Sequence, residues 1–123
     1  MLKGFESHTQ PLSENELRHE VQLLAREMIK HRGEDRAMSN GSIRDWFARN
    51  YGIKVGDAKV RAYINAIRTN GWCRHLIASS RGYYVATSVQ EVEDYCRSLR
   101  GRENAIKAVR LSLQEEIQGQ LFI

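Results

Sequence analysis

At 123 residues the chain has room for one domain of ordinary size and a short appendage. Hydrophobic residues make up 41% and charged residues 28%, a globular composition that argues against disorder. No apolar run reaches the roughly 20 residues of a membrane span, and the first residues lack the apolar core of a signal peptide. We therefore expect a cytoplasmic protein that does not bind membranes, with Cys73 and Cys96 as thiols.

The net charge of +4 is concentrated in the middle of the chain. Residues 36–90 hold nine basic and two acidic residues, whereas residues 1–35 and 91–123 have net charges of −2 and −1. A solvated surface does not require such segregation, but a surface that binds phosphates does. The distribution favours a nucleic-acid partner.

The first helix is predicted over residues 14–32. Ser13 and Glu16 form a capping box, apolar residues follow at helical spacing, and Gly33 ends the pattern. A very short strand is predicted at Ala37 and Met38.

Two further helices are predicted on either side of a glycine-rich turn. Ser42 caps a helix that ends near Gly52, and Asp57 caps a helix of about fourteen residues that ends at 70–71. Three aromatic residues are assigned to the core by their spacing: Trp46, Phe47 and Trp72.

Residues 73–78 and 83–87 are rich in aromatic and β-branched types and predict a hairpin with a basic tip. Alternation places Tyr83 and Val85 on the core side and Tyr84 outward. A capped helix then begins at Val89. Its apolar residues recur every seven positions, with an interruption at 101–103, so residues 92–117 form either a homodimer seam or a helix that packs on its own domain.

The order helix, helix, turn, helix, hairpin, helix resembles the winged helix-turn-helix superfamily, as do the segments SIRDWF (42–47), AKVRAYINAIRTNGW (58–72) and RGYYVAT (81–87). The chain is also similar to small winged-helix proteins of phages and mobile elements. The expected fold is therefore mainly α with a small β-hairpin (α+β). We expect an N-terminal tail at 1–12, a winged helix-turn-helix domain at 13–99, a helical extension at 100–117 and a flexible tail at 118–123.

The resemblance implies double-stranded DNA binding, with the helix from Asp57 in the major groove and the hairpin on the backbone or minor groove. Forked donors and amides on that helix suit base edges, and basic residues elsewhere suit phosphates. The candidate DNA-binding residues are Ser42, Arg44, Lys54, Lys59, Arg61, Asn65, Arg68, Arg74, Arg81 and Tyr84. The expected role is in replication or transcription regulation in a bacterial or phage-infected cell. The alternative is a winged helix that bridges proteins without binding DNA.

Catalysis is not expected, and neither is a cofactor. A zinc site needs Cys73, His75, Cys96 and a further ligand such as His31, but no paired ligand spacing is present. The two acidic residues of the basic region suit helix starts rather than a nuclease site.

The C-terminal residues Gln118–Phe122 match Q-x-x-L-F, which is similar to peptides that replication proteins insert into the bacterial sliding clamp. In such a complex Leu121 and Phe122 fill an apolar pocket while Gln118 hydrogen-bonds its rim. The alternative is that these apolar residues fold back onto the preceding helix or a dimer partner.

Overall fold

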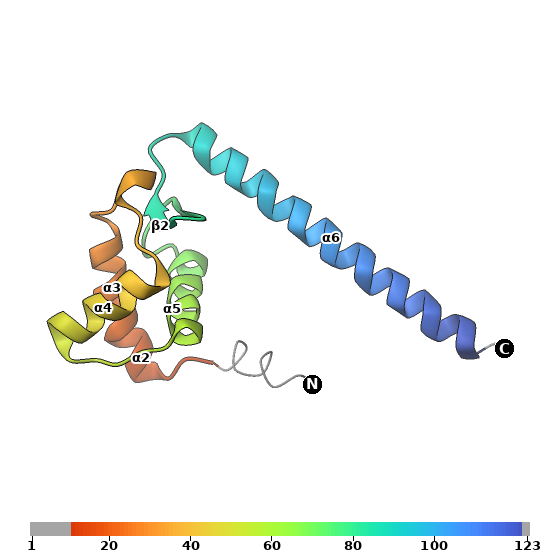
Figure 1. Ribbon diagram of the computed structural model, residues 1–123, viewed down its shortest axis with the longest axis horizontal. Coiled ribbons are helices and arrows are strands. Elements are labelled where there is room, and N and C mark those ends of the chain that lie inside the picture. Colours follow the sequence, from red (N-terminus) through yellow and green to blue (C-terminus); the bar gives the residue numbers. More distant parts are fainter. Residues whose placement is uncertain (1–10, 122–123) are drawn as a thin grey trace. The chain divides into compact units, whose positions relative to one another are not determined.

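The computed structural model describes residues 11–121, which divide into two compact units after Thr87. The described residues are mainly helical, with one two-stranded antiparallel sheet, so the α+β class is confirmed (Figure 1). We expected the N-terminal domain to extend to residue 99. Instead the second unit begins at Ser88 and holds only helix α6 (Val89–Leu121).

The predicted first helix is two helices, α2 (Glu14–Arg18) and α3 (Glu20–Met28), separated by His19 with φ −110° and ψ −77°. The capping box is confirmed. The Glu16 N–H donates to Ser13 Oγ at 3.1 Å, and the Ser13 N–H donates to the Glu16 carboxylate at 2.9 Å. Helix α3 ends four residues earlier than predicted, because the chain then pairs with the hairpin: the Gly33 N–H donates to the Val85 carbonyl at 2.9 Å.

The next two helices are α4 (Asn40–Tyr51) and α5 (Asp57–Asn70). The N-cap residue of each helix differs from the predicted one. Ser39 caps α4 because its hydroxyl accepts the Ser42 N–H at 3.1 Å, and Ser42 lies in the first turn. Gly56 is the N-cap of α5, so Asp57 is its first residue and not its cap. A short 3-10 helix, η1 (Glu34–Arg36), precedes α4.

The hairpin consists of β1 (Leu76–Ser79) and β2 (Gly82–Val85), with Leu76 paired to Val85 and Ser79 to Gly82. Met38 forms an isolated antiparallel bridge to Tyr83, which confirms the short extended segment predicted there. This bridge explains Gly82: its φ is +129°, and a Cβ at this position would lie 2.4 Å from the Met38 carbonyl oxygen. The close approach of the two backbones requires a residue without a side chain.

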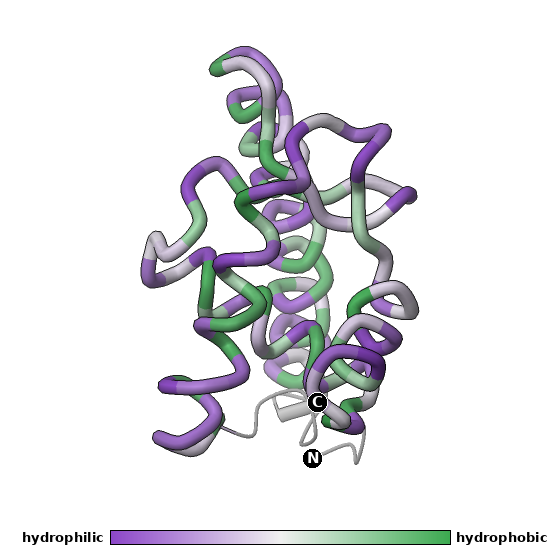
Figure 2. Tube along the Cα trace, turned by 90° about the vertical axis from the view of Figure 1, so that its left-hand side faces the viewer, coloured by the Kyte–Doolittle hydropathy of each residue, from purple (hydrophilic) through white to green (hydrophobic). Residues whose placement is uncertain are grey.

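The hydrophobic core of the first unit lies between α3, α4, α5 and the hairpin. Apolar and polar residues alternate along the trace of the chain (Figure 2). Its largest fully buried side chains are Tyr63, Phe47, Leu24, Met28, Ile43, Ile64 and Ile67. Phe47 is therefore core as predicted, and Trp46 packs partly buried against it. Trp72 was predicted wrongly: it follows the last turn of α5 and is 37% exposed.

Tyr84 is a second correction, because it was predicted to face outward and is buried at 5% exposure. Its cross-strand neighbour Ile77 is buried as well, while Tyr83 and Val85 pack against the core. Alternation identifies which residues share a face of a strand, but it does not tell whether the second face is exposed. Both faces of this hairpin are covered.

Helix α6 runs without a break through the predicted interruption at 101–103. The Glu91 N–H donates to Ser88 Oγ at 3.2 Å, which confirms its cap. One glycine costs a helix about 1 kcal/mol, and the many Ala, Leu, Glu, Lys and Arg residues around Gly101 offset that cost. The helix also continues to Leu121, so residues 118–121 are helical where we predicted a flexible tail.

Candidate nucleic-acid interface

Helix α5 presents one exposed polar face and buries the opposite one. Val60, Tyr63, Ile64 and Ile67 are buried, whereas Arg61 and Asn65 lie one turn apart on the solvent side. Ala58, Ala62 and Ala66 are half-buried beside these two side chains. The face therefore has a forked cation and an amide over a surface of methyl groups, with room for close approach.

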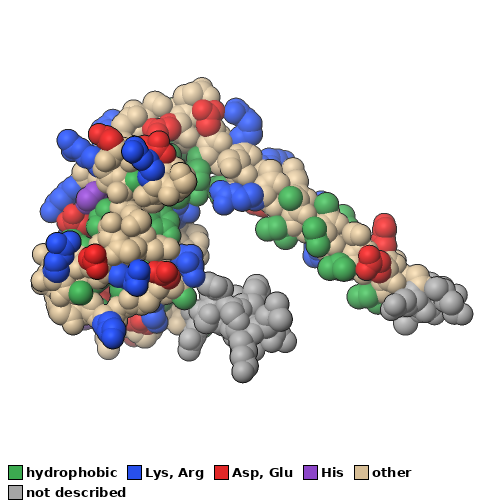
Figure 3. Space-filling view, viewed as in Figure 1, with side chains coloured by type: hydrophobic (Ala, Val, Ile, Leu, Met, Phe, Trp, Pro, Cys, Tyr) green, Lys and Arg blue, Asp and Glu red, His purple; other side chains and the backbone are tan. Residues whose placement is uncertain are grey.

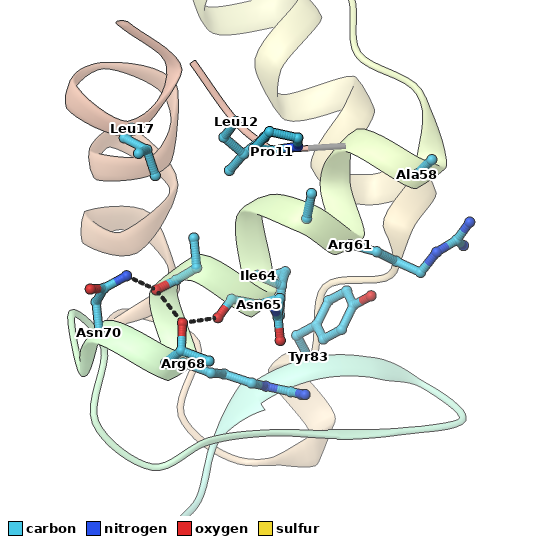
Figure 4. A pocket seen from close by; sticks show the side chains of 13 residues that line it. Pro11, Leu12, Leu17, Ala58, Arg61, Ile64, Asn65, Arg68, Asn70 and Tyr83 are labelled. Atoms are coloured by element: carbon cyan, nitrogen blue, oxygen red, sulfur yellow. Dashed lines mark hydrogen bonds between the residues drawn. The ribbon is translucent and has the colours of Figure 1, made fainter. Parts of the chain in front are cut away.

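A shallow pocket of about 850 Å³ lies along this face (Figure 4). Arg61 and Asn65 line it on α5, and Pro11, Leu12 and Tyr83 lie across from them. In the close view Arg61, Arg68 and Tyr83 extend to the same side of the helix. The α5 side of the pocket carries charged and amide groups among alanines, and its N-terminal rim is apolar.

Arg68 is only half-buried, and its guanidinium lies over the Tyr83 ring at 5.7 Å from the centroid. The Tyr83 hydroxyl donates to Asn40 Oδ1 at 2.9 Å. Cation–π contact and this hydrogen bond connect α5, β2 and the start of α4. Arg68, predicted as a DNA contact, thus has a structural position at the edge of the exposed face.

Lys59 forms an ion pair that the sequence did not reveal. Its ammonium lies 2.8 Å from the carboxylate of Glu16, which also accepts a hydrogen bond from the Tyr63 hydroxyl at 3.4 Å. The bond from Lys59 and the backbone bond from Ser13 hold the pKa of Glu16 below its usual range. Burial, together with the charge of Glu16, raises the pKa of Tyr63. Glu16, an acidic residue of α2, therefore borders the exposed face of α5.

Arg44 is similarly paired, since its Nε lies 2.9 Å from Asp57 Oδ1 at the first turn of α5. Both side chains are about half exposed, so this pair links α4 to α5 at the surface. A phosphate at Arg44 would compete with Asp57 in the same way that one at Lys59 competes with Glu16.

Three further predicted basic residues also lie exposed in the first unit: Lys54, Arg74 and Arg81. Arg81 occupies the two-residue turn between β1 and β2, and its backbone N–H donates to Ser79 Oγ at 3.1 Å. The hairpin tip therefore has one exposed cation with an ordered backbone.

Two predicted residues have surroundings that the sequence did not indicate. The amide of Ser42 is occupied by Ser39 Oγ, and its hydroxyl accepts a hydrogen bond from the Ser39 hydroxyl at 3.1 Å. Tyr84 is buried and does not belong to this surface. The sequence reasoning also missed Glu16 and Tyr83, although the capping box marked Glu16 as an ordered side chain.

Residues 11–121 hold no cluster of three His, Cys, Asp or Glu side chains that could bind a metal ion, and none of their helices has the length and apolarity to cross a membrane. Cys73 is buried, which raises the pKa of its thiol, and Cys96 is exposed on α6. Of the predicted clamp ligands, Gln118 is exposed in the last turns of α6, and Phe122 and the Leu121 side chain lie outside the described residues.

Comparisons with protein-family models, with curated protein sequences and with solved structures found no match to this chain.

Proposed function

We propose that the first unit is a winged helix-turn-helix domain that binds double-stranded DNA. The order of α3, α4, α5 and the hairpin supports this assignment, as does the glycine-bounded turn between α4 and α5. In this reading α5 enters the major groove, and the turn at Ser80 and Arg81 contacts the backbone or a minor groove. The remaining helix, α3, packs behind α5 as the scaffold.

The observation that carries the proposal is the exposed face of α5. Arginine offers two parallel donors to guanine, and asparagine pairs with the donor and acceptor of adenine. Arg61 and Asn65 present these groups one turn apart, and the alanines beside them allow a helix to approach base edges closely. The exposed residues on this face carry no acid beyond the first turn of α5, which suits a polyanion.

Exposed Lys54, Arg74 and Arg81 supply phosphate contacts around that face. Lys59 and Arg44 exchange Glu16 and Asp57 for phosphate when DNA binds. Such an exchange adds cations to the interface only as DNA approaches. We propose no catalytic role and no cofactor.

Binding of the full chain to a random duplex, measured by fluorescence anisotropy at several salt concentrations, tests the proposal. With about five phosphates neutralised, the log–log slope is near −4.5, so affinity falls several-hundred-fold between about 50 and 200 mM salt. Salt-independent binding, or none at low salt, would contradict DNA binding and favour the protein-bridging adaptor.

We place this activity in replication or transcription regulation of a phage or mobile element, in the cytoplasm of the host cell. The Q-x-x-L-F sequence at 118–122 supports a replication role with the sliding clamp as partner. Since α6 reaches Leu121, an extended bound peptide requires its last turn to unwind.

A further inference from the structure

Helix α6 carries a row of exposed apolar side chains along one side (Figure 3). Leu99, Ile106 and Leu113 recur every seven residues, and Val109 and Ile117 lie beside them. Ile106 is 70% exposed, Val109 60% and Leu113 53%. A contiguous apolar face of this kind marks an interaction surface.

The seven-residue repeat identifies the kind of partner. It is the repeat of a left-handed coiled coil, in which the covering element is another helix with the same period. Helices α3 and α5 already bury their apolar stripes in the core of the first unit. We propose that α6 of a second copy covers this face, antiparallel, with the two-fold axis beside Lys107 and Ala108.

Charge selects the antiparallel orientation. Arg102 and Glu116 occupy the same heptad position as Val109, seven residues before and after it. A parallel pair in register would place Arg102 against Arg102 and Glu116 against Glu116 of the second copy, which is repulsive. The antiparallel pair instead places Ile106 opposite Val109 and brings Arg102 within one turn of Glu116 of the second copy.

The flanks of the seam fit the same register. On one side, Glu103 lies opposite Arg110 of the second copy, and two-fold symmetry forms this pair twice. On the other side the facing residues are small, Ala105 opposite Ser112 and Ser98 opposite Gly119, so the helix axes can approach closely. The paired residues of the two helices extend from Leu99 to Glu116, which is about 27 Å of helix at 1.5 Å per residue. This inference concerns α6 alone and does not rest on DNA binding.

Sedimentation equilibrium of the full chain tests the surface with a matched pair of leucines. Leu113 lies on the proposed seam, and Leu111, which is 44% exposed, lies about 200° around the helix. Leu113→Lys should raise the dimer Kd by at least about a hundredfold, because two buried leucines are lost per dimer and each new lysine lies opposite Arg102 of the second copy. Leu111→Lys should leave the Kd within about twofold at equal helix content by circular dichroism. A monomeric wild type, or equal effects of the two variants, overturns the proposal.

A charge exchange tests the register. Glu103→Arg and Arg110→Glu alone should each raise the Kd several-fold, since each creates two like-charge contacts per dimer. The double variant E103R/R110E should restore the wild-type Kd within about twofold. Additive losses in the double variant contradict the pairing.

A distance measurement tests the orientation. Spin labels on exposed Gln90, as Gln90→Cys in a Cys96→Ser chain, lie 35 residues apart along an antiparallel pair, or about 52 Å. A parallel pair places them on opposite outer sides of two adjacent helices, about 20 Å apart. A distribution near 52 Å supports the proposed dimer, and one near 20 Å rejects it.

Discussion

Glu16 shows how one side chain serves stability and electrostatics together. It completes the capping box of α2, binds the Lys59 ammonium at 2.8 Å and accepts the Tyr63 hydroxyl. A carboxylate that accepts several bonds stabilises the fold, but it also lowers the positive potential at the edge of α5. Stability and the proposed phosphate binding therefore make opposite demands on this residue.

Glu16→Gln should separate the two demands. Glutamine keeps the capping box but loses the ion pair, so the free energy of unfolding in urea should fall by about 1 kcal/mol or less. DNA affinity at low salt should rise about two- to fivefold, because Lys59 is released and one negative charge is removed. Glu14→Gln, which removes an exposed carboxylate paired with Arg18 on the same helix, is the control and should change DNA affinity less.

The stability difference between wild type and Glu16→Gln should depend on pH. Because folding lowers the pKa of Glu16 below the ordinary value of 4.5, its stabilisation is fully present above that value. It is lost as pH falls through the lower, folded-state pKa. Urea unfolding between pH 3 and 7 measures this difference, and a difference that grows on acidification contradicts the assigned ion pair.

Arg61 and Arg81 should differ in the kind of DNA binding that they support. On a selected site, Arg61→Ala or Asn65→Ala should cost about 1–3 kcal/mol through lost base discrimination. Arg81→Ala should weaken all sequences alike and reduce the salt slope by about one. Competition binding with specific and random duplexes measures both effects. If the Arg61 and Asn65 variants keep the wild-type affinity and Arg81→Ala causes the largest loss, the hairpin and not α5 recognises the base sequence.

At the scale of elements, helical periodicity predicted where α3, α4, α5 and α6 lie, because the apolar stripe follows from burial on one side. It did not predict the caps, since Ser39 and Ser42 have equal capping chemistry and only the backbone path decides between them. The exposed α5 face was predicted for the same reason that its buried face was. The ion partners of Lys59 and Arg44 were missed, because Glu16 is distant in sequence and Asp57 was assigned to a cap.

The approach of β2 to Met38 makes a sharp prediction for the hairpin. Gly82→Ala should lower the free energy of unfolding by about 2 kcal/mol or more, since its Cβ meets the Met38 backbone and its φ is +129°. Gly41→Ala, in the first turn of α4 with ordinary contacts, should be neutral or stabilising by up to about 1 kcal/mol. Chemical denaturation measures the free energy of unfolding of both variants. Equal values for Gly82→Ala and Gly41→Ala would contradict the close approach of β2 to Met38.

The C-terminal residues give a test of the proposed replication role. A peptide ending in QGQLFI should bind the host's sliding clamp at micromolar Kd or weaker, about −8 kcal/mol at most, since only two apolar side chains are buried. Replacing Leu121 and Phe122 by Ala in the full chain should abolish this binding without changing DNA affinity. If titration calorimetry of the peptide with the clamp shows no heat of binding and the double variant has a lower Tm, these residues pack on the preceding helix or a dimer partner instead.

At the scale of the molecule, length, composition and apolar spacing predicted one small globular domain with a helical extension. The division after Thr87 was not predicted, because the apolar residues of 89–99 have the same spacing whether they pack on their own domain or on another molecule. Val89 is 67% exposed and Leu99 38%. A sequence pattern specifies that a face is apolar but not what covers it.

Because α6 is unbroken, it fixes the distance between the two ends of the proposed dimer. In the proposed dimer the two Ser88 residues, where the first units join the helices, are separated by 39 residues of helix rise, about 58 Å. Along B-DNA this corresponds to about 17 base pairs. The proposed dimer and the proposed DNA binding together predict two half-sites whose separation follows the length of α6. Inserting one heptad between Ser88 and Leu99 lengthens it by about 21 Å, so the preferred spacing of the two half-sites should grow by about six base pairs.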